Sequence, residues 1–134
     1  DDIIIYIHKK ISKISTKDEK ESVIKELKDR FGKLSNEILT YIEERYLESL
    51  LRKYKIREKD VMETSMLATI IIPSETSDKI SGDKLLMNGY RLSEKIDFEY
   101  NRNHQMLIKI KKDVNDKKWI YLLSELLEKD NFKN

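Results

Sequence analysis

The sequence lacks cysteine and has only one proline, three glycines and two histidines among its 134 residues. Without cysteine the chain cannot form disulfides, iron–sulfur clusters, thiolate zinc sites or a cysteine nucleophile. The glycines Gly32, Gly82 and Gly89 are too far apart to make a glycine-rich phosphate-binding loop. Many kinds of catalytic site are therefore excluded before any motif is considered.

An excess of charge of one sign is also missing, because 27 basic residues stand against 25 acidic ones. A dedicated nucleic-acid-binding domain usually has clustered lysine and arginine. The chain is long enough to bury a core, and no stretch approaches the roughly 18 apolar residues of a membrane span. Its acidic, apolar start is no signal peptide and carries no initiator methionine. We expect a cytoplasmic fragment of a longer protein, with no membrane partner.

Residues 1–57 are predicted to form three helices, because apolar residues recur there at steps of three and four. Thr16 begins a Thr-x-x-Glu capping box, Gly32 is a helix stop, and Ser35 or Asn36 can cap the third helix. The approximate helix bounds are residues 3–15, 17–31 and 36–54. The apolar face of the first helix consists of Ile4, Ile7, Ile11 and Ile14.

Residues 58–134 are predicted to form a small sheet with two further helices. Short β-branched or alternating runs indicate strands, whereas wide apolar stripes indicate helices. The expected elements are a strand at 65–73, a helix at 83–90 that buries Leu85, Leu86 and Tyr90, strands at 96–100 and 106–110, and a helix after Asn115 or Asp116 that buries Trp119. We therefore expect one α+β domain over residues 1–134, with the order β-α-β-β-α after the helical part.

Enzymatic chemistry has few candidates in this chain. His8 and His104 are the only imidazoles, they are far apart in the sequence, and neither belongs to a recognisable catalytic pattern. We expect no catalysis by this chain, although an enzyme that uses one of these histidines stays open as an alternative.

The densest basic region defines a second alternative, a small nucleic-acid-binding domain. Its candidate phosphate contacts are Lys109, Lys111, Lys112, Lys117 and Lys118. Acidic residues interrupt this region, and no aromatic stacking platform accompanies it. A solvated surface is the favoured interpretation.

A third candidate is the acidic edge of the second helix, where Glu26 and Asp29 are three residues apart. One interpretation is internal pairing, with Lys25 bound to Asp29 and Glu26 bound to Arg30. The other is a docking edge that binds an arginine-bearing partner. The residue pattern alone favours internal pairing.

The same helix carries a family resemblance. The run from Glu26 to Leu34 reads Glu-Leu-x-Asp-Arg-Phe-Gly-x-Leu, and it lies between a Tyr-Ile-His-Lys-Lys-Ile segment at residues 6–11 and a Leu-Arg-Lys-Tyr-Lys-Ile segment at 51–56. Together these segments closely resemble the C-terminal (TRCF) domain of the bacterial transcription-repair coupling factor family, Mfd. Ser35 stands where the family usually has proline, and a serine can also cap a helix.

The resemblance implies a regulatory function in DNA repair. Whole coupling factors are superfamily 2, ATP-dependent translocases on double-stranded DNA, which remove stalled RNA polymerase and recruit UvrA for nucleotide excision repair. Their C-terminal domain folds against a UvrB-like module of the same chain, masks its UvrA-binding surface and restrains the motor.

The resemblance also assigns residues and cofactors. Glu26 and Asp29 would pair with arginines of the UvrB-like module, with Arg30 on the same edge. No cofactor, metal or catalytic residue is expected in this chain, because ATP and magnesium would be bound by the parent motor.

Overall fold

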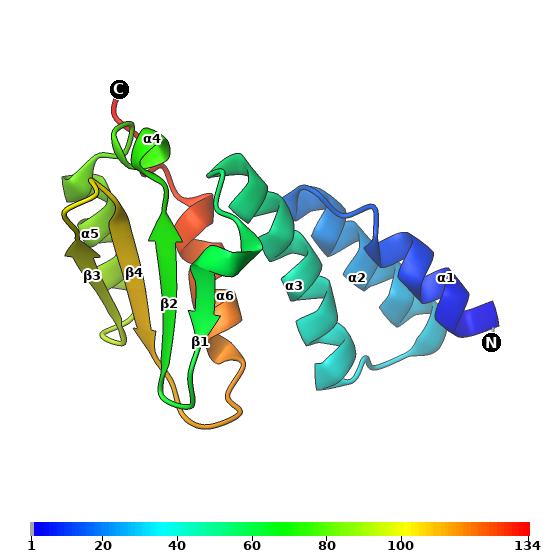
Figure 1. Ribbon diagram of the computed structural model, residues 1–134. Helices are drawn as coiled ribbons and strands as arrows, with labels where there is room; N and C mark the ends of the chain where they lie inside the picture. Colours follow the sequence, from blue (N-terminus) through cyan, green and yellow to red (C-terminus); the bar gives the residue numbers. More distant parts are fainter. Residues whose placement is uncertain (1) are drawn as a thin grey trace. The chain divides into compact units, whose positions relative to one another are not determined.

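The computed structural model describes residues 2–134 (Figure 1). These residues form two compact units that divide between Leu50 and Leu51. Helix α3 (Asn36–Lys53) runs through this boundary. The first unit also contains α1 (Asp2–Ile11) and α2 (Lys17–Phe31). The three predicted N-terminal helices are thus confirmed, although α1 ends about one turn earlier than its apolar pattern predicts.

Local capping chemistry sets the bounds of α2 and the start of α3. The Thr16 hydroxyl accepts a hydrogen bond from the Glu19 amide at 3.1 Å, as the capping box predicts. Gly32 ends α2 with φ at 80°, a conformation that glycine adopts without a side-chain clash. The Ser35 hydroxyl accepts from the Ile38 amide at 3.2 Å, so Ser35 is the cap of α3.

The core of the first unit joins apolar side chains from all three helices. Its buried members are Ile11, Ile14, Leu27, Leu34, Ile42, Tyr46, Leu47 and Leu50. Lys20 of α2 also forms an ion pair with Glu43 of α3 at 3.0 Å, and these side chains are only 13% and 7% exposed. The ammonium of Lys20 lies 4.6 Å from the centre of the Tyr46 ring. A nearly buried charge pair therefore links α2 to α3.

The first turns of α1 are more exposed than predicted. Ile4 was assigned to the apolar face of its helix, yet it is 54% exposed. Ile11 and Ile14, farther along the same predicted face, are buried. Consecutive isoleucines surround this end of α1, and the helices of this unit cover only part of its circumference.

No helix among residues 2–134 is long and apolar enough to cross a membrane.

The second unit is built on a four-stranded antiparallel sheet with the order β1-β2-β4-β3. Helices α5 and α6 lie on one face of this sheet (Figure 1). The elements of the unit are the 3-10 turn η1 (Glu58–Asp60), β1 (Val61–Glu63), β2 (Leu67–Ile72), α4 (Ser74–Ser77), α5 (Gly82–Leu92), β3 (Ile96–Tyr100), β4 (Met106–Lys111) and α6 (Lys118–Glu128). The α+β prediction is confirmed, with β1 and the single turn α4 as additions.

Every second residue of β2 and of β4 points into the core of the second unit. Ala68, Ile70 and Ile72 of β2 are fully buried, as are Ile108 and Ile110 of β4. Most of the predicted apolar stripe of α6 is buried as well, with Trp119 only 7% exposed, whereas Leu122 is half-buried. Of the residues that α5 was predicted to bury, Leu85 is buried and Leu86 is half-buried. The prediction was wrong for Tyr90, which is 53% exposed.

Strand β3 forms an outer edge of the sheet, and a side chain satisfies one of its edge amides. The Lys111 amide of β4 donates a hydrogen bond to the Lys95 carbonyl, just before β3. Because main-chain groups alternate in direction along a strand, the amide of Phe98 points away from β4. The Asp97 carboxylate accepts a hydrogen bond from the Phe98 amide at 2.9 Å. It also accepts from the Tyr90 hydroxyl at 3.3 Å, which joins α5 to this edge.

Close packing of α5 on β3 predicts a position-specific effect of glycine substitution. A Cβ atom at Gly89 would lie 2.4 Å from the Phe98 ring, whereas a Cβ at Gly82 would meet nothing within 4 Å. We expect Gly89→Ala to lower the free energy of unfolding by roughly 1–3 kcal/mol through overpacking. Gly82→Ala, the matched control, is expected to be neutral or to stabilise by up to about 1 kcal/mol.

Urea denaturation of both variants measures this difference. Combining Gly89→Ala with Phe98→Leu is expected to recover part of the loss, because the smaller side chain makes room for the added methyl group. Equal stability of the two single variants would contradict the proposed packing constraint.

Candidate docking site on helix α2

The rotation of α2 about its own axis determines where its charged side chains point. Leu27 is fully buried and therefore marks the core side of the helix. At about 100° per residue, Arg30, Glu26 and Asp29 lie roughly 60°, 100° and 160° around the helix from Leu27, all in the same direction. The three charged residues thus lie along one flank of α2, between its core side and its solvent side.

Glu26 contacts helix α1. Its Oε1 accepts a hydrogen bond from the Tyr6 hydroxyl at 2.9 Å and lies 3.3 Å from the Lys10 ammonium. Tyr6 and Lys10 are one helical turn apart, so both lie on the same side of α1. The Glu26 side chain nevertheless remains 42% exposed. It is held in place without being removed from solvent.

Hydrogen bonding shifts the titration of Glu26. The Tyr6 hydroxyl, assisted by Lys10, lowers the pKa of the Glu26 carboxyl below its ordinary value of 4.5. Both groups favour the charged form of the carboxylate, and this outweighs the opposing effect of partial desolvation. Glu26 is therefore ionised at neutral pH, as binding to an arginine requires.

Arg30 also reaches toward α1, but its partner is an aromatic face. Its guanidinium carbon lies 4.4 Å from the centre of the Tyr6 ring and 5.9 Å from the centre of the Phe31 ring. The Tyr6 and Phe31 rings meet edge to face, with centroids 6.1 Å apart. Such cation–π contacts place a guanidinium while leaving its N–H donors available.

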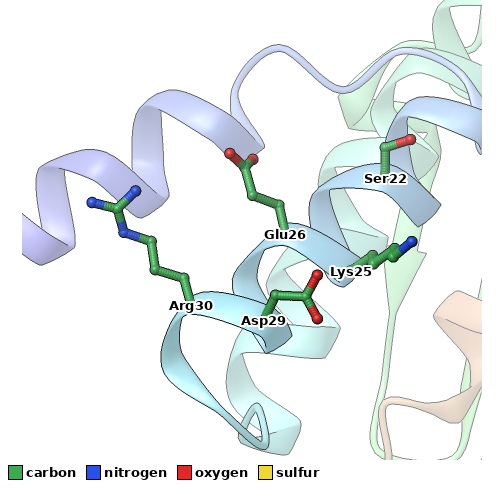
Figure 2. A pocket seen from close by; sticks show the side chains of 5 residues that line it. All are labelled: Ser22, Lys25, Glu26, Asp29 and Arg30. Carbon is green, nitrogen blue, oxygen red and sulfur yellow. The ribbon is translucent and has the colours of Figure 1, made fainter.

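Asp29 differs from both neighbours, because no hydrogen bond or ion pair engages its carboxylate among residues 2–134. Figure 2 shows Glu26 and Arg30 reaching toward α1 while the Asp29 carboxylate turns away from Arg30. These side chains line a shallow, open depression of about 460 Å³ together with Ser22 and Lys25. The depression thus contains three charged groups in different states. The Glu26 carboxylate is bonded to α1, the Asp29 carboxylate has no partner among the described residues, and the Arg30 guanidinium is stacked on Tyr6.

The internal pairing suggested by the sequence was wrong. Neither the Lys25–Asp29 nor the Glu26–Arg30 ion pair forms among the described residues. Sequence reasoning also missed Tyr6 and Lys10 as parts of this site. Their spacing of four residues was visible, but the choice of α1 face that meets α2 depends on tertiary packing.

The predicted basic cluster is largely engaged in contacts within the second unit. The Lys112 side chain is only 2% exposed, pairs with Glu63 at 3.0 Å, and donates to the carbonyls of Thr64 and Ser65 at 3.0 and 3.3 Å. It thereby fixes the turn between β1 and β2. Two other members also have acidic neighbours, since Lys109 lies 3.0 Å from Glu99 and Lys117 lies 3.8 Å from Glu63. Three of these five lysines therefore have acidic neighbours, and the side chain of Lys112 is withdrawn from the surface.

The two histidines bind tyrosine hydroxyls. His8 Nδ1 lies 3.0 Å from the Tyr41 hydroxyl, and His104 Nδ1 lies 3.3 Å from that of Tyr100. Neither imidazole is paired with a carboxylate in the part of the chain that the structure describes. Residues 2–134 also hold no group of three or more His, Asp or Glu side chains that could bind a metal ion.

Comparison with known proteins relates this fold to one family. The sequence-family model named TRCF domain matches residues 3–81, which is more than half of the chain and includes all of α2. A crystal structure of the C-terminal domain of transcription-repair coupling factor is similar in fold, with a TM-score of 0.73 and 22% sequence identity. The match covers 92% of this chain and 76% of that one. No curated protein matches the sequence.

The contacts of Glu26 predict a pH-dependent contribution to stability. Because the folded state lowers the pKa of Glu26, this contribution is present above the unfolded value and is lost as the pH falls through the lower folded value. We expect Glu26→Gln to destabilise the chain at about pH 7 and to have progressively less effect as the pH falls below the ordinary glutamate pKa of 4.5 and through the lower folded value. Urea midpoints measured across this range test the expectation, and a constant difference at all pH values would contradict it.

Proposed function

Because the chain belongs to the TRCF domain family, the family of the C-terminal domain of transcription-repair coupling factors, we propose that it is a regulatory domain that docks on the UvrB-like module of its parent protein. In the docked state it masks the UvrA-binding surface of that module. It also restrains the ATP-dependent DNA translocase that removes stalled RNA polymerase during nucleotide excision repair. ATP and magnesium are bound by the parent motor, whereas this domain supplies a contact surface.

The open carboxylate of Asp29 beside Glu26 is the observation that carries this proposal. Asp29 has no partner among residues 2–134 and projects from the solvent side of a helix whose opposite side is buried. Tyr6 and Lys10 both contact Oε1 of Glu26, so its Oε2 atom is available to a further donor. Two carboxylates one helical turn apart suit the planar fork of an arginine side chain.

The strength of such contacts suits a restraint that opens during the work cycle. A coupling of only about 1–3 kcal/mol is enough to regulate a partner site. Charge-assisted hydrogen bonds are specific in geometry, yet exposed ones separate without the large cost of stranding a buried charge. An edge of exposed carboxylates therefore supports a reversible clamp better than an apolar interface would.

Removing both carboxylates is expected to weaken docking while the domain stays folded. The double variant Glu26→Ala with Asp29→Ala is expected to reduce affinity for the purified UvrB-like module by roughly 10- to 100-fold, the loss of one or two hydrogen bonds to charged groups. Isothermal titration calorimetry measures the affinity, and circular dichroism checks the fold.

The matched control is Asp18→Ala with Glu21→Ala, which removes two exposed carboxylates at the same spacing elsewhere on α2. This control changes the net charge equally and is expected to bind like the unmodified chain. Equal weakening by both double variants would reduce the effect to net charge, and unchanged affinity in the Glu26 and Asp29 variant would remove these residues from the interface.

A further inference from the structure

Glu26 and Arg30 would ordinarily be expected to pair with each other. They are four residues apart on one helix, with the acidic residue nearer the N-terminus, which is the favourable orientation for such a pair. No ion pair joins them among the described residues, although Arg30 is near enough to help lower the Glu26 pKa. Some feature of the site must hold the two charges apart.

Tyr6 is placed to separate them, because different parts of its side chain contact each group. Its hydroxyl donates to Glu26 Oε1 at 2.9 Å, while its ring lies 4.4 Å from the Arg30 guanidinium carbon. The Tyr6 ring is in turn held edge to face against Phe31. One half-buried side chain of α1 thus fixes the positions of two charged side chains of α2.

We propose that Tyr6 is a positioning residue of the docking site. By holding Glu26 and Arg30 apart, it presents a carboxylate and a guanidinium as two separate binding groups beside the open carboxylate of Asp29. The partner surface that fits this arrangement carries an arginine for the two carboxylates and an acidic side chain or a carbonyl for Arg30. The identity of that partner as the UvrB-like module rests on the proposed function, whereas the separation of the charges does not.

Preorganisation is the physical consequence. A partner that met a Glu26–Arg30 pair would have to break it and also order both long side chains, and each of these steps lowers affinity. In the observed arrangement both side chains are already placed before contact. Lys10 helps to hold the Glu26 carboxylate, because its ammonium lies 3.3 Å from Glu26 Oε1. The same ammonium is 5.6 Å from the centre of the Tyr6 ring, which is a weaker contact.

Two substitutions separate the functions of the hydroxyl and the ring. Tyr6→Phe removes the hydrogen bond to Glu26 but keeps an aromatic face for Arg30. Tyr6→Leu removes both. In the unbound chain, NMR titration of the Glu26 carboxyl carbon is expected to show a higher pKa in Tyr6→Phe than in the unmodified chain. In Tyr6→Leu the Arg30 side-chain N–H signals are expected to shift as the guanidinium pairs with Glu26.

Loss of that pairing on adding Glu26→Gln to Tyr6→Leu would identify Glu26 as the new partner of Arg30. If the Glu26 pKa and the Arg30 signals were the same in all three chains, Tyr6 would not position either group and the inference would be overturned. These measurements need no partner, so they test the inference even if the proposed function is wrong.

Binding to the UvrB-like module provides the second test. We expect Tyr6→Leu to weaken docking roughly 3- to 10-fold and Tyr6→Phe to weaken it less, because the ring still places Arg30. In a chain that already carries Glu26→Ala and Arg30→Ala, adding Tyr6→Leu is expected to cause no further loss. A general structural defect would lower affinity in both backgrounds.

Tyr41→Leu is the matched control, since Tyr41 is another partly exposed tyrosine of the first unit whose hydroxyl contacts His8 rather than the docking edge. It is expected to bind like the unmodified chain. No binding by the unmodified chain would refute the proposed function alone. Binding that depends on Glu26 and Asp29 but not on Tyr6 would refute the positioning role alone.

Discussion

Burial of Leu27 sets the rotation of α2, and the candidate docking site depends on that rotation. With this side chain fully enclosed, the helical repeat leaves Arg30 nearest the core, Glu26 beside α1 and Asp29 toward solvent. The caps at either end of α2 fix its extent, and the Lys20–Glu43 pair holds it against α3. Hydrophobic packing thereby decides the placement of charges that it does not itself contact.

The three charged residues of the edge have different physical roles although they are close in sequence. Glu26 is restrained by Tyr6 and Lys10, Arg30 is stacked on an aromatic face, and Asp29 is open. Restrained groups give an interface its geometry, while an open group keeps its full capacity for a partner. A surface of this kind can be specific without binding tightly, which agrees with the reversible regulatory contact that we propose.

The sequence predicted those features whose chemistry is complete within a few residues. Thr16 and Gly32 satisfy helix ends through neighbours three or four positions away, so their roles were readable in advance. Strand β1 was missed because three residues carry no clear alternation and are ordered by pairing with β2. The partners of Glu26 and the burial of Lys112 depend on residues 16 to 49 positions away, and no local pattern encodes such contacts.

The Asp97 carboxylate on β3 has a consequence beyond its own hydrogen bonds. An outer strand with free amides is a template on which strands of other molecules can assemble, and fibrous aggregates grow by that route. Because Asp97 occupies the Phe98 amide and is tied to α5 through Tyr90, an incoming strand would find this donor taken and a negative charge in its path. Strand addition at this position of β3 is therefore disfavoured by a side chain of the edge strand itself.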